Sequence, residues 1–241
     1  MKKSKLPCDL KSCFMCRTSL KEWLPALGEN RINYQVKKGE VIFREGEPVK
    51  GVYFVYEGKV KVHKQWGNDK ELIIRFAKKG SIFGHRGLGS NLVYPVSATA
   101  LEPCVVCFID IEFFNATLKV NNEFAYTLML FFADELQESE RKMRNLAHMP
   151  VKGRVAQALI SLREKFGLTA EGFIDIELTR QDLASYAGAT YETVFRIIND
   201  LVQDKMIKLS GKSIMIIDDL RLDSLTHQQV TTPVDGGVIT T

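Results

Sequence analysis

Hydrophobic positions between residues 190 and 202 recur at intervals of three and four, which predicts a helix that buries one face. The buried stripe is expected to contain Val194, Ile197, Ile198, Leu201 and Val202. A shorter helix is predicted before it, because Thr179 and Asp182 stand at the spacing of an N-terminal capping box. Gly188 interrupts the pattern, so the two helices should meet at a turn.

Alternating apolar residues flank the predicted helix pair on both sides. The alternation over residues 174–178 predicts a strand, and residues 208–209 and 214–217 predict a hairpin around a turn at 210–213. Two helices with a glycine turn and a following hairpin indicate a winged helix-turn-helix. In such a unit the second helix enters the DNA major groove, where its first turns meet the base edges.

Residues 31–110 contain short apolar runs separated by glycine turns, a pattern typical of a double-sheet roll. The expected strands lie within Gly39–Phe43, Val52–Tyr56, Val60–His63, Leu72–Phe76 and Val105–Ile109. The first half of the chain is therefore expected to be a β domain.

From residue 122 to residue 147 the hydrophobic period becomes helical. The a and d positions of three heptads are Ala125, Met129, Phe132, Leu136, Ser139, Met143 and Leu146. A single helix could bury this stripe against its own roll, but polar neighbours leave a narrow line that favours a helix pair and a homodimer. Residues 151–162 should form a helix that joins the roll to the helix-turn-helix, with a hinge near 148–152.

The composition is that of an ordinary globular protein: 241 residues, 45% hydrophobic and 26% charged, enough for two modest domains. With no signal peptide pattern and no apolar run long enough to cross a bilayer, we expect a cytoplasmic protein without a membrane partner. The net charge is +4, but residues 151–241 hold 10 basic against 12 acidic residues. DNA binding would therefore depend on the local placement of Arg180, Arg196, Lys208 and Lys212.

Glu192 and Arg196 lie one turn apart on the polar face of the second helix. Arginine can donate to O6 and N7 of guanine together, and glutamate accepts from N4 of cytosine, so the pair suits a G·C-containing step. The alternative is a surface ion pair between the two side chains, worth about 0.2–0.5 kcal/mol.

Several motifs resemble those of the Crp/Fnr family of transcription regulators. The run Glu192-Thr193-Val194-Phe195-Arg196 matches the Glu-Thr-x-x-Arg pattern of the family's recognition helix, and residues 178–183 and the wing at 211–212 match as well. GEVIFREGEP at 39–48 and GSIFG at 80–84 look like parts of the family's cyclic-nucleotide-binding roll.

The resemblance implies an α+β fold: an N-terminal cyclic-nucleotide-binding-like double-sheet β-roll, a long dimerisation helix and a C-terminal winged helix-turn-helix. The expected boundaries are 1–20 for a cysteine-bearing segment, 21–120 for the roll, 121–148 for the dimerisation helix, 149–222 for the DNA-binding domain and 223–241 for a disordered tail. The implied DNA-contacting residues are Thr179, Arg180, Gln181, Thr190, Tyr191, Glu192, Thr193, Arg196 and Lys212. The implied partners are double-stranded DNA, a second copy of the chain and RNA polymerase.

Three of the five cysteines, Cys8, Cys13 and Cys16, lie in the first twenty residues. In a cytosolic chain, clustered cysteines are more often metal ligands or redox groups than disulfides. The family resemblance implies that Cys107, rather than Cys104, supplies the distant fourth ligand of an Fnr-type [4Fe–4S] cluster. The spacing of x4 and x2 departs from the family's x2 and x5, so a structural zinc site and ordinary thiols stay open as alternatives.

Nucleotide-binding members of the family carry a glutamate directly after the Phe-Gly turn, where this chain has His85. Tyr94 and Pro95 occupy the place of the Arg-Ser or Arg-Thr pair that holds the phosphate, and proline lacks a backbone donor. Tight binding of cyclic AMP is therefore not expected. An effector pocket is predicted around His85, Arg86 and Ser139, with a haem ligated by His85 or a solvated His-Arg turn as alternatives.

The predicted function is a homodimeric transcription regulator that senses a redox or gaseous signal in its N-terminal region and binds a palindromic site. One alternative is a regulator of the same type without a metal centre that responds to a small molecule. Another is a ligand-sensing regulatory protein that does not bind DNA. An enzyme is not expected, because the sequence has no Walker loop, dinucleotide glycine pattern, HExxH motif or nucleophile elbow.

Overall fold

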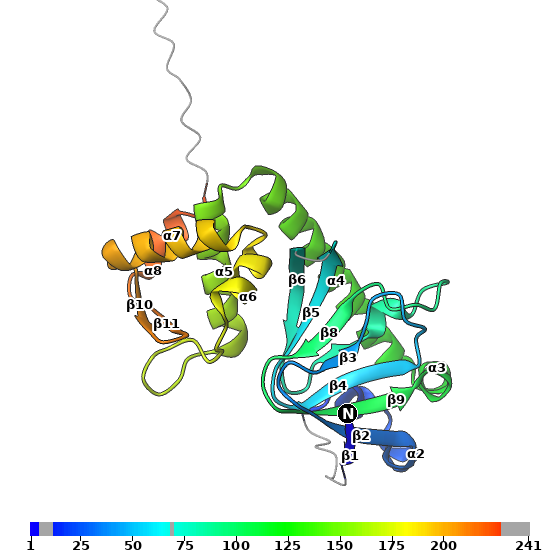
Figure 1. Cartoon of the computed structure of the whole chain (residues 1–241). Helices are drawn as coiled ribbons and strands as arrows, with labels where there is room; N and C mark the ends of the chain where they lie inside the picture. Colours follow the sequence, from blue (N-terminus) through cyan, green and yellow to red (C-terminus); the bar gives the residue numbers. More distant parts are fainter. Residues whose placement is uncertain (5–11, 68–69, 228–241) are drawn as a thin grey trace, which may run out of the picture.

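The computed structural model describes residues 1–4, 12–67 and 70–227, which form two lobes joined by one long helix (Figure 1). The lobe at the lower right of Figure 1 contains the two large β-sheets, and the lobe at the left contains helices and a small hairpin. None of the helices in the described ranges is both long enough and apolar enough to span a membrane.

The first lobe is a roll made of two antiparallel sheets. One sheet has the order β1 (Lys2–Ser4), β2 (Arg31–Val36), β9 (Cys104–Asp110), β4 (Gly51–Glu57) and β7 (Ile82–Phe83). The other has the order β3 (Val41–Phe43), β8 (Ser97–Ala100), β5 (Val60–Trp66) and β6 (Lys70–Ala77). Apolar side chains of both sheets fill the interior, so the predicted double-sheet roll is confirmed, with β1, β2, β7 and β8 in addition to the expected strands.

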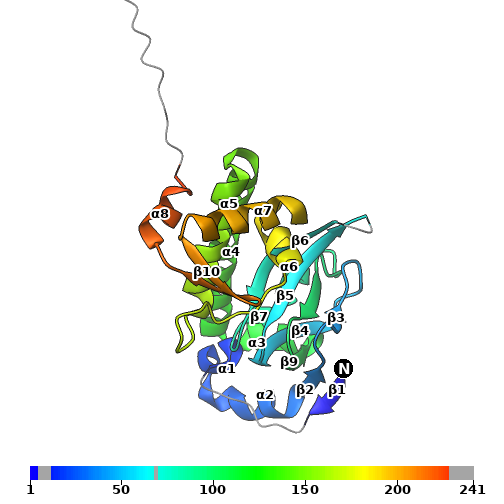
Figure 2. The same cartoon turned by 60° about the vertical axis from the view of Figure 1, so that its left-hand side comes forward.

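Short helices cover one end of the roll, where the sequence analysis predicted none (Figure 2). They are α1 (Phe14–Thr18), the 3-10 helix η1 (Lys21–Trp23), α2 (Leu24–Asn30) and α3 (Ile111–Val120). The ring of Phe14 lies 6.0 Å from that of Phe124 and 5.5 Å from that of Phe131, which joins α1 to the long helix. With 5 and 7 residues, α1 and α2 are too short to display a helical period.

The long helix α4 (Asn122–His148) contacts the roll along one side and then extends to the second lobe. Phe124 and Leu128 on its buried face join the core beside α1. The helix ends where Met149 and Pro150 adopt extended backbone conformations, and α5 (Val151–Phe166) follows directly. This break lies within the hinge region predicted from the sequence.

The second lobe is the predicted winged helix-turn-helix. It consists of α5, α6 (Arg180–Ala187), α7 (Tyr191–Gln203), the hairpin of β10 (Ile207–Ser210) and β11 (Ser213–Ile216), and α8 (Asp219–Ser224). Its core also takes in Ile73 and Phe76 of β6, so the two lobes share one buried apolar cluster. In the predicted α7 stripe, four residues are buried and Val202 is exposed.

One expectation for this lobe is wrong. Residues 174–178 form no strand within the described chain: Ile174 makes an isolated bridge to Leu168, and the segment runs extended into the cap of α6. Its alternation reflects the burial of every second side chain against the core rather than sheet pairing. The last described helix of the lobe, α8, is capped by Asp218 and buries Leu222 fully. The tail after residue 227 lies outside the described residues.

Candidate functional site

The first helix of the helix-turn-helix begins at a complete capping box. The Thr179 side chain accepts a hydrogen bond from the Asp182 backbone N–H at 3.0 Å, and Asp182 Oδ2 accepts one from the Thr179 backbone N–H at 3.3 Å. The helix ends at Gly188, which has a φ of 62°. The left-handed backbone at this position requires glycine. An added Cβ would also lie 2.4 Å from Cδ2 of Leu146 on α4, at the end of an exposed side chain that can rotate away. The predicted cap and turn are confirmed.

The second helix, α7, has one buried and one exposed face. Its N-terminus is capped by Thr190, whose side chain accepts a hydrogen bond from the Thr193 backbone N–H at 3.3 Å. The buried face consists of Val194, Ile197, Ile198 and Leu201, and the exposed face includes Tyr191, Glu192, Phe195, Arg196 and Asn199. The core packing of one face therefore directs the polar residues of the first two turns outward.

Glu192 and Arg196 take part in no ion pair with each other or with any other described residue. The surface ion pair considered as the alternative for these residues is therefore absent. Next to them, the rings of Tyr191 and Phe195 stack at 6.1 Å with an interplanar angle of 20°. The exposed face thus combines two charged groups and an aromatic pair on one side of a rigid helix.

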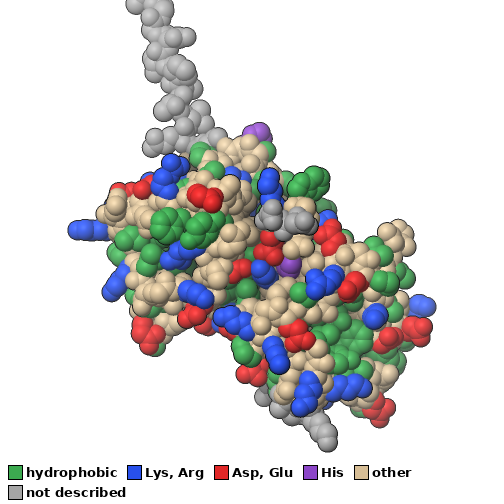
Figure 3. Space-filling view, viewed as in Figure 1, with side chains coloured by type: hydrophobic (Ala, Val, Ile, Leu, Met, Phe, Trp, Pro, Cys, Tyr) green, Lys and Arg blue, Asp and Glu red, His purple; other side chains and the backbone are tan. Residues whose placement is uncertain are grey.

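The wing follows α7 as a tight hairpin. Ser210 pairs with Ser213, and Gly211 with a φ of 59° and Lys212 form the turn. Lys208 and Lys212 are exposed, whereas Arg180 is partly buried and shares a small cavity with Lys212. Burial lowers the pKa of Arg180. In Figure 3, acidic and basic side chains are mixed over the visible face of this lobe, in line with its lack of a net positive charge.

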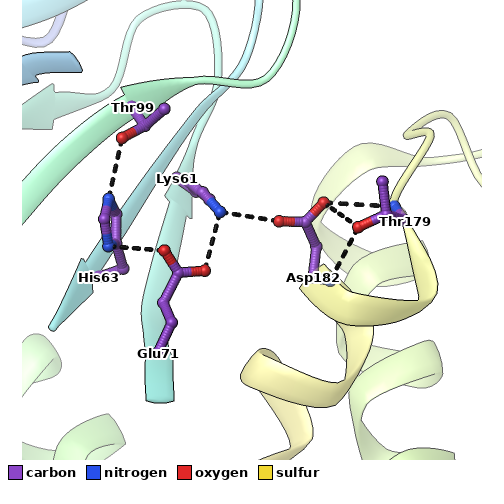
Figure 4. Close-up of polar contacts among 6 residues, drawn as sticks. All are labelled: Lys61, His63, Glu71, Thr99, Thr179 and Asp182. Carbon is purple, nitrogen blue, oxygen red and sulfur yellow. Dashed lines mark hydrogen bonds and ion pairs between the residues drawn. The ribbon is translucent and has the colours of Figure 1, made fainter. Parts of the chain in front are cut away.

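A polar network connects the start of α6 to the roll (Figure 4). Lys61 Nζ of β5 donates to Asp182 Oδ1 at 2.8 Å and to Glu71 Oε1 at 2.8 Å. Glu71 Oε2 lies 2.8 Å from His63 Nδ1, whose other ring nitrogen lies 2.9 Å from the Thr99 hydroxyl. Asp182 therefore serves two purposes: it caps α6, and it holds that helix against the roll.

Electrostatics favours the charged state of this network. Burial raises the pKa of Glu71, but its bonds to His63 and Lys61 outweigh burial and bring the pKa to about 2. Burial lowers the pKa of Lys61, but the bonds to Asp182 and Glu71 outweigh it, and the net shift is upward. The sequence analysis missed this network, because Lys61 and Asp182 are 121 positions apart and no local pattern links them.

Three of the four predicted cysteine ligands can be located. Cys13, Cys16 and Cys107 belong to one buried apolar cluster between α1, β9 and α4, and Cys8 lies outside the described residues. Cys104 stands on the opposite face of β9, where it donates to the Glu102 carbonyl at 3.1 Å, and burial raises its pKa to about 11.

This arrangement favours Cys107 over Cys104 as a partner of the N-terminal cysteines. Thiols are the ligands that soft metal centres take, and these three cysteines belong to the same apolar cluster. Within the described residues, however, no three His, Cys, Asp or Glu side chains are grouped closely enough to hold a metal ion.

The predicted seam of α4 lies on its solvent side. The side chains of Met129, Leu136 and Met143 are 57%, 60% and 61% exposed, and Phe132 and Leu146 are exposed as well. The alternative, in which this stripe is buried against the chain's own roll, is therefore wrong. A row of exposed apolar side chains at heptad spacing favours a partner helix.

The environment of the predicted effector residues differs from a solvated turn. His85 is only 2% exposed and lies between the rings of Phe131 and Phe132 of α4, at centroid distances of 5.1 and 5.3 Å. Burial lowers its pKa to about 3, with a further contribution from Arg75. The expectation of a solvated His-Arg turn is therefore wrong for His85, because α4 covers the ring.

Arg86 and Ser139 come together at a cavity of about 200 Å³, whereas His85 does not line it. Arg86 Nη2 donates to Glu135 Oε2 at 2.7 Å, and Glu135 also pairs with the buried Arg75 at 3.2 Å. The predicted effector group is thus divided: two residues face the cavity, and His85 is part of the core.

Two models of known protein families match consecutive parts of the chain. The cyclic nucleotide-binding domain matches residues 34–121, and the Crp-like helix-turn-helix domain matches residues 153–225. The chain belongs to the Crp/Fnr family of transcription regulators. A Crp/Fnr regulator binds DNA through its helix-turn-helix domain, and members of the family are dimers.

Relatives with different names are equally similar to this Crp/Fnr protein. This chain is 29% identical over 198 residues to the transcriptional activator protein anr of Pseudomonas aeruginosa. The alignment covers 81% of this chain and 80% of that protein. The chain is also 29% identical over 177 residues to the cAMP-activated global transcriptional regulator CRP of Pasteurella multocida, with coverages of 73% and 85%. The structure of FixK2 from Bradyrhizobium japonicum matches with a TM-score of 0.74 at 26% identity, covering 82% of this chain and 98% of that chain. Sequence identity therefore does not decide the signal.

The interior of the roll in this Crp/Fnr protein is filled with aromatic rings. The ring of Tyr94 stacks on that of Phe43 at 4.0 Å, and its hydroxyl donates to the Gly51 carbonyl at 2.7 Å. Tyr53 and Phe83 complete the stack. Tyr94 thus occupies the interior with a side chain that carries no positive charge, at a position where nucleotide-binding relatives are expected to hold a phosphate.

Proposed function

We propose that this protein is a homodimeric regulator whose two α7 helices read a palindromic site, with Glu192 and Arg196 in contact with a G·C-containing step of each half-site. The observation that carries this proposal is the exposed face of α7, where both side chains are free of ion pairs among the described residues. Thr179, Arg180, Gln181 and Lys212 would contact the phosphate backbone around this step. RNA polymerase is the protein partner that such a role implies.

The dimer is supported by the exposed stripe of α4, centred on Leu136. Pairing two copies of α4 about a two-fold axis buries this stripe and relates the two α7 helices by the same axis. Two recognition helices related in this way match half-sites about one helical turn of DNA apart.

Selection from random duplexes tests the DNA-binding proposal. The purified protein should enrich an inverted repeat with a G·C-containing step in each half, and sedimentation should give one dimer per duplex. Enrichment of no sequence, or of a single unrepeated half-site, would contradict the proposal.

For the signal, we propose a redox or gas response through Cys13, Cys16 and Cys107, with Cys8 as the remaining predicted ligand. The shared burial of the three described cysteines supports this, and contacts of α1 with α4 offer a direct path to the dimerisation helix. A [4Fe–4S] cluster at this position would supply the oxygen-sensitive chemistry. An anaerobic absorption spectrum with iron, sulfide and zinc analysis tests the cluster: visible absorption that bleaches in air and is absent in Cys107→Ser supports it, and a colourless protein without either metal removes it.

A second candidate is control by a small molecule without a metal centre. The cavity beside Arg86 and Ser139 favours it, since this cavity touches elements of both lobes. Cyclic AMP is not the proposed effector, because Tyr94 and Pro95 stand where an arginine and a backbone donor would hold its phosphate.

A further inference from the structure

The cavity between the lobes lies outside the roll interior. Its walls come from β6, the second half of α4, α5 and the end of α6, and it has a volume of about 200 Å³. Leu72, Met143 and Tyr186 form apolar parts of the wall, while Tyr94 and the aromatic stack of the roll take no part in it. It is therefore distinct from the place where a cyclic nucleotide would be held inside the roll.

Cations outnumber carboxylates along this wall. The lining cations are Arg86, Arg141, Lys142 and Arg154, and among the described residues that line the cavity Glu138 is the single carboxylate. Glu138 pairs with Arg141 and also lies 3.6 Å from Lys142. Arg86 forms an ion pair with Glu135. Arg154 has no carboxylate partner in the described part of the chain. The wall has an excess of positive charge that the chain does not balance locally.

Arg154 and Lys142 are donors at this cavity that could bind an additional acceptor. The Arg154 Nε atom is buried and has no hydrogen-bond acceptor among the described residues. Lys142 Nζ donates to the Ile74 carbonyl at 2.8 Å and lies 4.9 Å from the ring of Tyr186, and burial lowers its pKa to about 8. A buried donor without an acceptor is unfavourable, and an anionic oxygen is the acceptor that binds a guanidinium most strongly. An anion in this cavity would also raise the pKa of Lys142.

We infer that this cavity binds a small organic acid, whose carboxylate accepts hydrogen bonds from Arg154 and lies near Lys142, and whose apolar body packs against Tyr186 and Met143. The inference rests on the regulatory function proposed above, for which it names the chemical class of an effector. The apolar wall and the small volume favour a carboxylate with a compact hydrocarbon body over inorganic phosphate. Because such a ligand touches both lobes, it changes the equilibrium between their arrangements and, by linkage, the affinity for DNA.

Ligand titration into the full-length protein tests the site. Benzoate, hexanoate and inorganic phosphate are compared at constant ionic strength, by calorimetry and by the shift in melting temperature, with benzamide as the uncharged counterpart of benzoate. We expect saturable binding of at least one of the two organic acids, at least tenfold weaker binding of benzamide, and no saturable binding of phosphate.

Variants locate the binding. Arg154→Met should abolish the response to the organic acid, and Ser139→Leu should weaken it by narrowing the cavity without removing a charge. Arg163→Met on the same helix is the matched control, since Arg163 pairs with Asp219 outside the cavity and its loss should leave binding unchanged. Binding that is unaffected by both Arg154→Met and Ser139→Leu would place the site elsewhere and overturn the inference.

The remaining outcomes separate this inference from the proposed function. Absence of saturable binding by both organic acids, equal binding of benzamide, or binding of phosphate alone overturns the inferred ligand class.

DNA affinity is measured separately by fluorescence anisotropy, with and without the acid, on a selected palindrome. An affinity that stays within twofold at saturating acid overturns the effector role. Failure of the protein to bind any duplex, both with and without the acid, contradicts the proposed function and leaves the anion site intact.

Discussion

Arg196 is the residue whose loss should change sequence recognition most directly. Its guanidinium is exposed on α7, and a bidentate contact to guanine is worth about 1–3 kcal/mol of discrimination. Arg196→Ala should therefore weaken binding to the selected operator by about that amount for each of the two half-sites and relax the preference at one step of each. Lys212→Ala, in the wing, should instead weaken all sequences alike and reduce the slope of affinity against salt by about 1 for each protomer. Anisotropy titrations on the operator and on its substituted forms distinguish the two, and an Arg196→Ala protein that discriminates like the wild type would contradict the readout.

His85 should make the folded state sensitive to mild acid. Its pKa is about 3 in the folded protein because of burial, against about 6.5 when unfolded, so the unfolded chain takes up a proton in this window and the folded one does not. The unfolding free energy is therefore unaffected by His85 above pH 6.5 and falls as the pH is lowered toward 3. At pH 5 the loss amounts to about 2 kcal/mol.

His85→Phe should remove that loss and flatten the dependence of unfolding free energy on pH between 7.5 and 5. His227→Phe is the control, since it replaces an exposed histidine outside the core. Urea denaturation at several pH values measures the effect. Equal slopes for the wild type and His85→Phe would show that folding does not lower the pKa of His85.

At the scale of elements, the sequence predicted what local chemistry determines. The capping box of Thr179 and Asp182, the break at Gly188 and the wing turn at Gly211 all depend on residues within a few positions of one another, and all three are confirmed. The prediction of a strand at residues 174–178 is wrong, because alternating apolar residues indicate only that every second side chain is buried. An extended segment packed against a helical core buries alternate side chains without a partner strand. The burial of His85 could not be predicted, because the rings that cover it lie more than 40 positions further along the chain.

The turn between α6 and α7 provides a prediction with a matched control. Gly188 and Gly211 have nearly the same left-handed φ, 62° and 59°, but an added methyl group overlaps Leu146 only at Gly188, and nothing lies within 4 Å at Gly211. Gly211→Ala should cost about 1–2 kcal/mol of stability from the backbone alone. Gly188→Ala should cost up to about 1 kcal/mol more, because the Leu146 side chain must leave its rotamer. Urea denaturation of both variants measures the difference, and equal losses would show that the contact with α4 is loose.

Lys61 should control how firmly the two lobes are held together. Lys61→Met leaves Glu71 and Asp182, which are only 19% and 14% exposed, without the cation between them, so the lobes should separate more readily. We expect a larger radius of gyration in X-ray scattering and faster proteolysis between α4 and α5. Lys64→Met on the same strand removes an exposed pair with Glu45 within the roll and should change neither. Identical scattering by Lys61→Met and wild type would assign the contact between lobes to the shared apolar core alone.

The exposed stripe of α4 links oligomeric state to DNA affinity. Leu136 is 60% exposed at the middle of the stripe, so Leu136→Glu should leave each monomer folded but place two carboxylates opposite one another in the dimer. Sedimentation should then show a monomer, and affinity for the palindrome should fall by orders of magnitude because each half-site is bound separately. Leu130→Glu, at a position 47% exposed on the same helix but outside the seam, is the control and should remain dimeric. A Leu136→Glu protein that is still dimeric, or a monomer that binds the palindrome like the wild type, would show that α4 does not set the spacing of the two α7 helices.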